Sequence, residues 1–267
     1  MQISIRHTTR YSYDAAGSSA VQRLRLTPSD NRAQRVLFWS IEAAGIEHAA
    51  QYVDGFGNRV HLVTHAGPYE ALSITAAGEV ETNDTGGVLG NLGEAANPRL
   101  FLRATPLTQS SRAIDAMAES LSARHMLDRM HFLLEAIAAR VAYVTDTTSA
   151  GTTASEAFDA GNGVCQDHAH IFIAAARRLS VPARYVTGYL HVDAEEAAVA
   201  HHAWAEAWLD ELGWVGFDPA NHICPTEFYV RLACGFDAAS AAPVTGTHRG
   251  GGAESLKVDV IVRQQQQ

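Results

Sequence analysis

The period of the hydrophobic residues changes twice along this chain of 267 residues. Over the first eighty residues apolar and polar side chains alternate, which is typical of strands that bury one face. Between residues 111 and 180 the apolar side chains recur at the three- and four-residue spacing of helices, and from residue 183 to residue 218 the strand pattern returns. This order separates an N-terminal β module from a part that combines helices and strands.

Residues 1–82 are predicted to form the β module. The run Asp54-Gly55-Phe56-Gly57-Asn58 lies between two predicted strands and is rich in residues that tolerate positive φ, as in a hairpin turn. Closely spaced strands separated by turns indicate a sandwich-like arrangement. The predicted strands are Ile3–Tyr13, Val21–Thr27, Arg35–Glu42, Ala50–Val53, Val60–Thr64 and Leu72–Val80.

Residues 83–110 are predicted to be a linker, because turn residues such as Asn97-Pro98 interrupt any periodicity. A second domain is predicted over residues 111–237. Residues 238–252 are small and contain glycine, which predicts a loop, whereas Leu256–Val262 alternates as a strand that must find a sheet, for which the β module is the candidate. The predicted helices are Ser111–Arg124, Leu127–Val141, one starting at the capping box Thr153–Glu156, and Val164–Ser180; the later strands are Ala183–Val192, His201–Leu209 and Trp214–Asp218.

The composition excludes several classes of protein. A formal net charge of −9 without any basic run argues against nucleic acid as a partner. The N-terminus alternates like a strand rather than like a secretory signal, and no apolar stretch approaches the length of a membrane span. Cys165, Cys224 and Cys234 are too few for a disulfide framework, so we expect a cytoplasmic protein with reduced thiols and no membrane contact.

Three short segments carry residues that suit one kind of chemistry. Cys165 stands at the predicted start of a helix, where unpaired amides favour a thiolate and could hold an oxyanion. His202 and Asp218 lie on the two strands that follow. A thiol nucleophile, a base and a carboxylate that orients the base form the inventory of cysteine-dependent acyl transfer.

The geometry of the last two residues depends on strand register. His202 shares a strand face with Trp204 and Glu206, and Asp218 shares one with Trp214 and Gly216. Asp218 can reach the imidazole only if a hairpin at residues 210–213 brings these two faces together, because a slip of one residue would turn Asp218 away.

The run from residue 152 to residue 221 resembles the papain-related core of the transglutaminase-like superfamily, and the turn at residues 54–58 resembles the β module that often precedes this core in bacteria. The resemblance implies an α+β fold, with helices packed on an antiparallel sheet and an N-terminal β-sandwich-like module. It also implies that Cys165 is the nucleophile, His202 the general base and acid, and Asp218 the orienting carboxylate. The matching segments are Thr152-Thr153, Gly163-Val164-Cys165-Gln166-Asp167-x-Ala169-His170, Val181-Pro182-Ala183-Arg184-Tyr185-Val186-x-Gly188-Tyr189, His202-Ala203-Trp204-x-Glu206 and Trp214-x-x-Phe217-Asp218-Pro219-x-Asn221.

The second oxyanion donor is not identified. Cross-linking enzymes of this superfamily have an upstream tryptophan for that role, but this chain has no tryptophan between Trp39 and Trp204 and no run of calcium ligands. The oxyanion and pocket candidates are Val164, Gln166, Trp204 and Glu206. We expect no metal and no cofactor, because the spacing of Cys165, His168 and His170 does not suit a closed zinc site.

The sequence therefore predicts a cysteine hydrolase with a Cys-His-Asp triad that acts on peptide or isopeptide amide bonds of a peptide or protein substrate. One alternative is a protein-glutamine transglutaminase or deamidase, which differs only in whether an amine or water resolves the thioester. The other alternative is a non-catalytic protein-interaction module. Neither the substrate nor the oligomeric state follows from the sequence.

Overall fold

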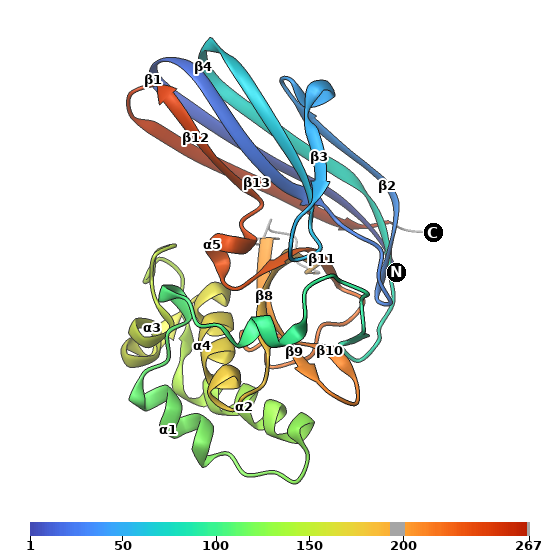
Figure 1. Cartoon of the computed structure of the whole chain (residues 1–267), viewed down its shortest axis with the longest axis vertical. Helices are drawn as coiled ribbons and strands as arrows, with labels where there is room; N and C mark the ends of the chain where they lie inside the picture. The colour runs from blue at the N-terminus through green and yellow to red at the C-terminus, as the bar shows by residue number, and fades with distance from the viewer. Residues whose placement is uncertain (193–200, 266–267) are drawn as a thin grey trace.

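The computed structural model describes residues 1–192 and 201–265. They form two bodies stacked end to end, a tall folded β-sheet and a more compact mixed domain that holds most of the helices (Figure 1). No helix in these described ranges is long and apolar enough to cross a membrane.

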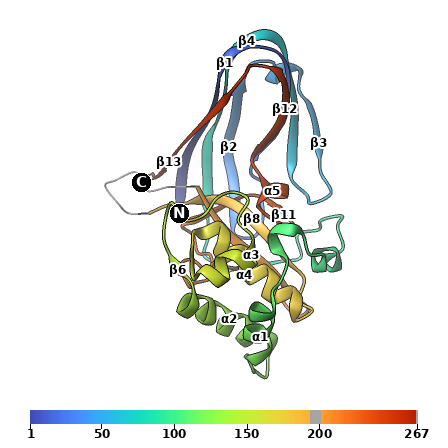
Figure 2. The same ribbon diagram turned by 90° about the vertical axis from the view of Figure 1, so that its left-hand side faces the viewer.

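Two very long strands, β1 (Gln2–Thr27) and β4 (Arg59–Thr82), run side by side through the N-terminal sheet. Both strands turn over at the end remote from the mixed domain and run back, so that the sheet folds into two layers (Figure 2). The sequence predicted two separate strands in each of these stretches. That prediction was wrong in detail, because the polar residues between them stay extended and the ladder continues across irregularities between Ser12 and Gly17 and between Gly17 and Ser19.

The edges of this sheet come from both ends of the chain. On the β4 side are β2 (Gln34–Ala43) and β3 (Ala50–Val53), and on the β1 side are β12 (Val244–Gly250) and β13 (Glu254–Gln264). The predicted C-terminal strand is confirmed and pairs with the β module. The predicted loop at residues 238–252 is wrong, because α5 (Ala238–Ala241) and β12 occupy it; β12 completes the sheet edge beside the second half of β1.

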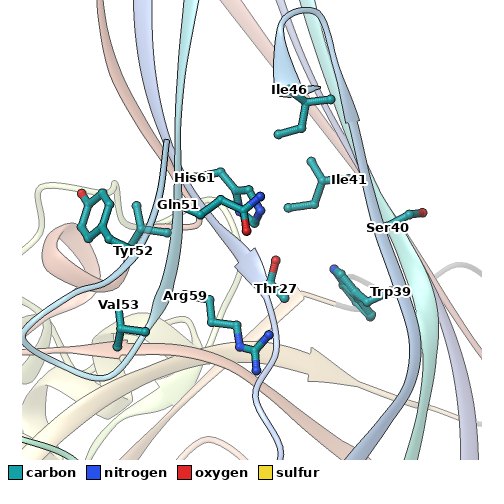
Figure 3. A pocket seen from close by; sticks show the side chains of 11 residues that line it. Thr27, Trp39, Ser40, Ile41, Ile46, Gln51, Tyr52, Val53, Arg59 and His61 are labelled. Atoms are coloured by element: carbon teal, nitrogen blue, oxygen red, sulfur yellow. The ribbon is translucent and has the colours of Figure 1, made fainter. Parts of the chain in front are cut away.

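Apolar side chains from both layers form a shared core, with Leu24, Leu26 and Val63 from one layer against Ile5 and Ile74 from the other. Between the edge strands β2 and β3 the layers leave an open cavity of about 610 Å³ (Figure 3). Its lining includes Trp39, Ile41, Arg59 and His61 and none of the triad candidates.

The mixed domain contains a five-stranded antiparallel sheet in the order β11-β8-β9-β10-β5. The helix α4 (Cys165–Arg178) packs on this sheet, and its apolar residues pack with the alanines of β9 and with Phe217. This arrangement confirms the predicted α+β fold.

The strands of this sheet are β5 (Val88–Gly90), β8 (Ala183–Leu190), β9 (His201–Leu209), β10 (Gly213–Phe217) and β11 (Tyr229–Gly235). A separate two-stranded pair consists of β6 (Ala142–Tyr143) and β7 (Asn162–Gly163). The other helices are α1 (Arg112–Ser120), α2 (Met126–Arg140) and α3 (Ala154–Ala160), and short 3-10 turns lie at Ile46–His48, Pro98–Leu102 and Pro106–Thr108.

The predicted turn at residues 54–58 has a second role, since it joins the two bodies. Asp54 closes the turn by accepting hydrogen bonds from the amides of Phe56 and Asn58. The buried Asn58 side chain donates to the Cys234 carbonyl at 2.8 Å and accepts from the Cys234 amide at 2.9 Å. Phe56 packs edge-on against Phe236.

We expect Asn58→Ala to destabilise the protein by about 3 kcal/mol, because it leaves a buried amide and a buried carbonyl of Cys234 without partners. Chemical denaturation measures the change. Asn91→Ala is the matched control, since Asn91 is exposed and caps only a surface turn, and it should change the unfolding free energy by less than about 0.5 kcal/mol. Equal effects of the two substitutions would contradict the role given to Asn58.

Candidate active site

Cys165 is the first residue of α4 and is partly exposed. The amides of Cys165 and Gln166, at the first two helical positions, have no intrahelical acceptor and no other partner among the described residues. They therefore point the positive end of the helix dipole at the region around the thiol. This environment favours negative charge at the sulfur or on an oxygen beside it.

The Asp167 side chain, in the first turn of α4, stabilises the start of this helix through hydrogen bonds. Its Oδ2 accepts hydrogen bonds from the Val164 amide at 2.8 Å and from Thr148 Oγ1 at 2.6 Å, and its side chain is fully buried. The Val164 amide is consequently unavailable to an oxyanion, which removes the reason for counting Val164 among the oxyanion candidates. Gln166 donates from its side chain to the Ala150 carbonyl at 3.4 Å, so both residues hold the loop at 144–152 beside the helix start.

His202 lies near the start of β9. Its Nε2 is 2.7 Å from Asp218 Oδ2, and the Cys165 thiol lies near enough to the imidazole to interact with it electrostatically. Burial alone would lower the pKa of His202, but the hydrogen bonds and the negative charges of Asp218 and Cys165 raise it to about 10. The arrangement therefore favours an imidazolium beside the Asp218 carboxylate.

Asp218 follows directly after β10 and is surrounded by donors. Its Oδ2 accepts from the Tyr229 hydroxyl and the Asn221 side chain, both at 2.7 Å, and its Oδ1 accepts from the amides of Ala220 and Asn221. Burial opposes ionisation, but these bonds and the neighbouring His202 hold the pKa of Asp218 below its usual value. A carboxylate fixed at both oxygens can in turn fix the orientation of the imidazole.

The strand register required by the sequence is present. In the β9–β10 hairpin Trp214 is opposite Trp208 and Gly216 is opposite Glu206, so the two faces that carry His202 and Asp218 coincide. The prediction of a shared face is confirmed. The Gly213 turn has φ of 76°, a conformation that favours glycine and closes this hairpin tightly.

Glu206 lies on the same face of β9 as Trp204, and its side chain is engaged within the protein. It is fully buried, and its carboxylate accepts from Arg184 at 2.6 Å and from Arg231 at 2.7 Å. Although burial opposes ionisation, these two guanidinium groups lower the pKa of Glu206. Both carboxylate oxygens are thus engaged by arginine, and Glu206 is part of a buried ion cluster rather than an oxyanion donor.

Trp204 forms a wall behind the site. Its ring stacks beside His202 at 6.4 Å between centroids, meets Tyr229 edge-on at 5.5 Å, and is almost entirely buried. These contacts restrict the imidazole and the tyrosine that donates to Asp218. Trp204 also lines a small cavity of about 30 Å³ together with Glu206 and Tyr229, so it stays a pocket candidate.

The other histidines near the site are engaged in the fold. His168 contacts the carbonyls of Val164 and Val141 through its two ring nitrogens, and His170 accepts from the Ala238 amide at 3.0 Å. His201 lies 2.9 Å from Thr187 Oγ1, and burial together with the charge of His202 lowers the pKa of His201 to about 4. His201 is therefore a neutral packing residue at neutral pH.

Sequence reasoning missed two tyrosines at the site. Tyr229, on β11, lies 11 residues beyond Asp218, and no local pattern in the sequence links the two. Tyr143, on β6, pairs with Gly163 two residues before Cys165, and its ring centroid is 6.0 Å from that of His168. Burial and the negative charges of Cys165 and Asp218 raise the pKa of Tyr143, which places its hydroxyl in the electrostatic field of both groups.

Two family models match the chain. The bacterial transglutaminase-like N-terminal region matches residues 3–81, and the transglutaminase-like superfamily matches residues 115–219. The chain therefore carries a transglutaminase-like core preceded by a bacterial transglutaminase-like N-terminal region. The predicted resemblance is confirmed for both parts, which together span more than half of the chain.

Individual proteins are also similar to this chain. An uncharacterised protein of Mycobacterium leprae is 29% identical over 96% of this chain and 95% of its own length. A protein-glutamine gamma-glutamyltransferase of Pseudomonas aeruginosa is 28% identical over 54% of this chain, which is 21% of its own length. The crystal structure of a proposed cysteine protease from Cytophaga hutchinsonii covers 100% of this chain and 92% of that chain with a TM-score of 0.76 and 22% identity, a likeness that shows a common fold.

Proposed function

We propose that this protein is a cysteine-dependent acyl-transfer enzyme that hydrolyses peptide or isopeptide amide bonds. The observation that carries the proposal is the position of the His202 imidazole, 2.7 Å from Asp218 Oδ2 and near enough to the Cys165 thiol to interact with it electrostatically. A nucleophile, its base and the group that orients the base are thus connected in the order that thiol catalysis needs.

In the proposed reaction the Cys165 thiolate attacks the carbonyl carbon of the amide, and the carbonyl oxygen becomes an oxyanion. The imidazolium of His202 then donates its proton to the departing nitrogen as the carbon–nitrogen bond breaks, leaving a thioester on Cys165. Water next attacks the thioester, His202 accepts a proton from it, and the acid leaves while the thiolate is restored. Asp218 holds the imidazole through both steps and remains ionised, as its lowered pKa allows.

The oxyanion needs two donors. The amide of Cys165, unpaired at the helix start, supplies the first. We assign the second to the Tyr143 hydroxyl, since β6 places Tyr143 beside Gly163 and its raised pKa keeps the hydroxyl protonated as a donor. No other described residue donates to or accepts from that hydroxyl, and just over half of the Tyr143 side chain is exposed to an incoming substrate.

A second candidate function is transfer of the acyl group to an amine, as in a protein-glutamine transglutaminase, or deamidation of glutamine. The favouring observation is the sequence similarity to the gamma-glutamyltransferase of Pseudomonas aeruginosa. The same thioester serves both reactions.

We also propose that the protein works in the cytoplasm, since a reducing compartment would keep the Cys165 thiol free to react. Cell fractionation tests this part of the proposal.

Incubation with a peptide library, with and without an added primary amine, tests the proposed function by mass spectrometry. Hydrolysis should give peptides with new termini whether or not the amine is present, whereas transfer should give amine adducts and deamidation should give glutamate in place of glutamine. Cys165→Ala should abolish every product, while Cys224→Ala, at the other partly exposed cysteine, should leave product formation intact. The same products from Cys165→Ala would contradict the proposal.

Tyr143→Phe should lower kcat for hydrolysis of p-nitrophenyl acetate by about tenfold to a hundredfold with little change in KM, because it removes one hydrogen bond made mainly in the transition state. Alkylation of Cys165 by iodoacetamide, which forms no oxyanion, should keep its wild-type rate and pH profile. Tyr52→Phe, at an exposed tyrosine on β3, is the control and should leave both measurements unchanged. An unchanged kcat, or an equal loss in alkylation rate, would exclude the oxyanion role of Tyr143.

A further inference from the structure

The strand β13 forms a free edge of the N-terminal sheet. It pairs with β1 without interruption from Gln264 opposite Ile3 to Glu254 opposite Tyr13, and no strand among the described residues pairs with its other side. Figure 2 shows β13 at the outer side of the folded sheet. A row of backbone donors and acceptors is therefore open along eleven residues.

The opposite edge of the sheet is interrupted or short, whereas β13 is long and continuous. On that side β2 has an irregularity between Val36 and Phe38, and β3 is only four residues long. Bulges and short strands are the usual means by which proteins prevent an edge from pairing with another chain. β13 is long, contains no proline and keeps a continuous register with β1.

The side chains of β13 also favour a covering strand. Leu256, Val258, Val260 and Val262 share the face that continues the sandwich interior, yet Leu256 is 55% exposed and Val258 is 48% exposed. Ile261 on the other face is 41% exposed. These apolar side chains lie in a row along the open edge, where another strand would shield them from water.

We propose that β13 pairs antiparallel with β13 of a second copy of this chain, about a two-fold axis at Val258, to form a dimer with a continuous sheet. In this register Lys257 lies opposite Asp259 of the partner subunit, and the symmetry repeats the pair. On the apolar face Leu256 lies opposite Val260 of the partner subunit. Opposite charges and apolar side chains in directly opposed positions both stabilise antiparallel pairs.

The charges select this register over its neighbours. A slide of two residues in one direction places Asp259 opposite Asp259 of the partner subunit, and a slide in the other direction places Lys257 opposite Lys257 of the partner subunit. Both arrangements oppose like charges, which destabilises a pair.

A slide of one residue is unfavourable for another reason, because it places the apolar face of one strand beside the charged face of the other. The two-fold arrangement is closed, so it forms a dimer and not a filament.

Sedimentation velocity over a wide range of protein concentration tests the proposal with a charge exchange. The wild type should show a concentration-dependent dimer. Asp259→Lys and Lys257→Asp should each weaken the dimer by about tenfold or more in Kd, because each opposes like charges twice. The double variant, which restores opposite charges at both positions, should regain most of the wild-type affinity.

Asp210→Lys, an exposed charge reversal at the turn between β9 and β10, is the matched control and should leave the dimer unchanged. Circular dichroism establishes that every variant is folded before its assembly state is compared. A wild type that is monomeric at all concentrations would overturn the proposal, and so would a dimer that the single variants do not weaken. Hydrogen exchange should be slowed, on dimerisation, at those β13 amides that do not bond to β1. None of these results depends on the chemistry at Cys165.

Discussion

The hydrogen bond between His202 and Asp218 is the interaction on which the candidate active site depends. Asp218 accepts from the imidazole, from Tyr229 and Asn221 and from two backbone amides, so that a buried carboxylate remains ionised where burial alone would neutralise it. Its charge in turn keeps the imidazole protonated beside the thiol. Without a fixed carboxylate the imidazole would lose both its orientation and the electrostatic reason to carry a proton.

The fold supplies this carboxylate and its partners from separate elements. The β9–β10 hairpin aligns His202 with Asp218, the start of α4 brings Cys165 near the ring, and β11 contributes Tyr229. The ion cluster of Arg184, Glu206 and Arg231 links β8, β9 and β11 beneath the site. The Gln34 side chain, in the β module, donates to the Arg231 carbonyl and accepts from the Arg231 amide. The N-terminal sheet therefore stabilises the strand that carries Tyr229.

The elements that carry the candidate triad could be predicted from the sequence, because their signal is the local period of the hydrophobic residues. Periodicity over short segments predicts the helix that starts at Cys165 and the strand that contains His202. It also predicts that Asp218 shares a strand face with Trp214 and Gly216. What could not be predicted depends on long-range pairing. The two strands expected within residues 3–27 form one continuous β1, whose polar middle is held by distant backbone, since Asp14 and Ala15 donate to the carbonyls of Ala253 and Gly251. β12 and β11 contain few alternating apolar residues and become strands through their neighbours, and Tyr143 reaches the site only because β6 pairs with β7. Glu206 matched the position of a pocket residue, but the arginines that engage it lie 22 and 25 residues away in the sequence.

The most direct test of the account is the protonation state of His202, read by nitrogen NMR of protein with labelled histidine and assigned with His202→Gln. The account predicts that His202 gives imidazolium signals at about pH 8, above the usual histidine pKa of about 6.5, and loses its proton only near the raised pKa of about 10. Converting Cys165 to a neutral mixed disulfide should lower the pKa of His202, because the sulfur charge contributes to the rise. A neutral imidazole at about pH 8 in the unmodified protein would contradict the central claim that Asp218 keeps a charged histidine beside the thiol.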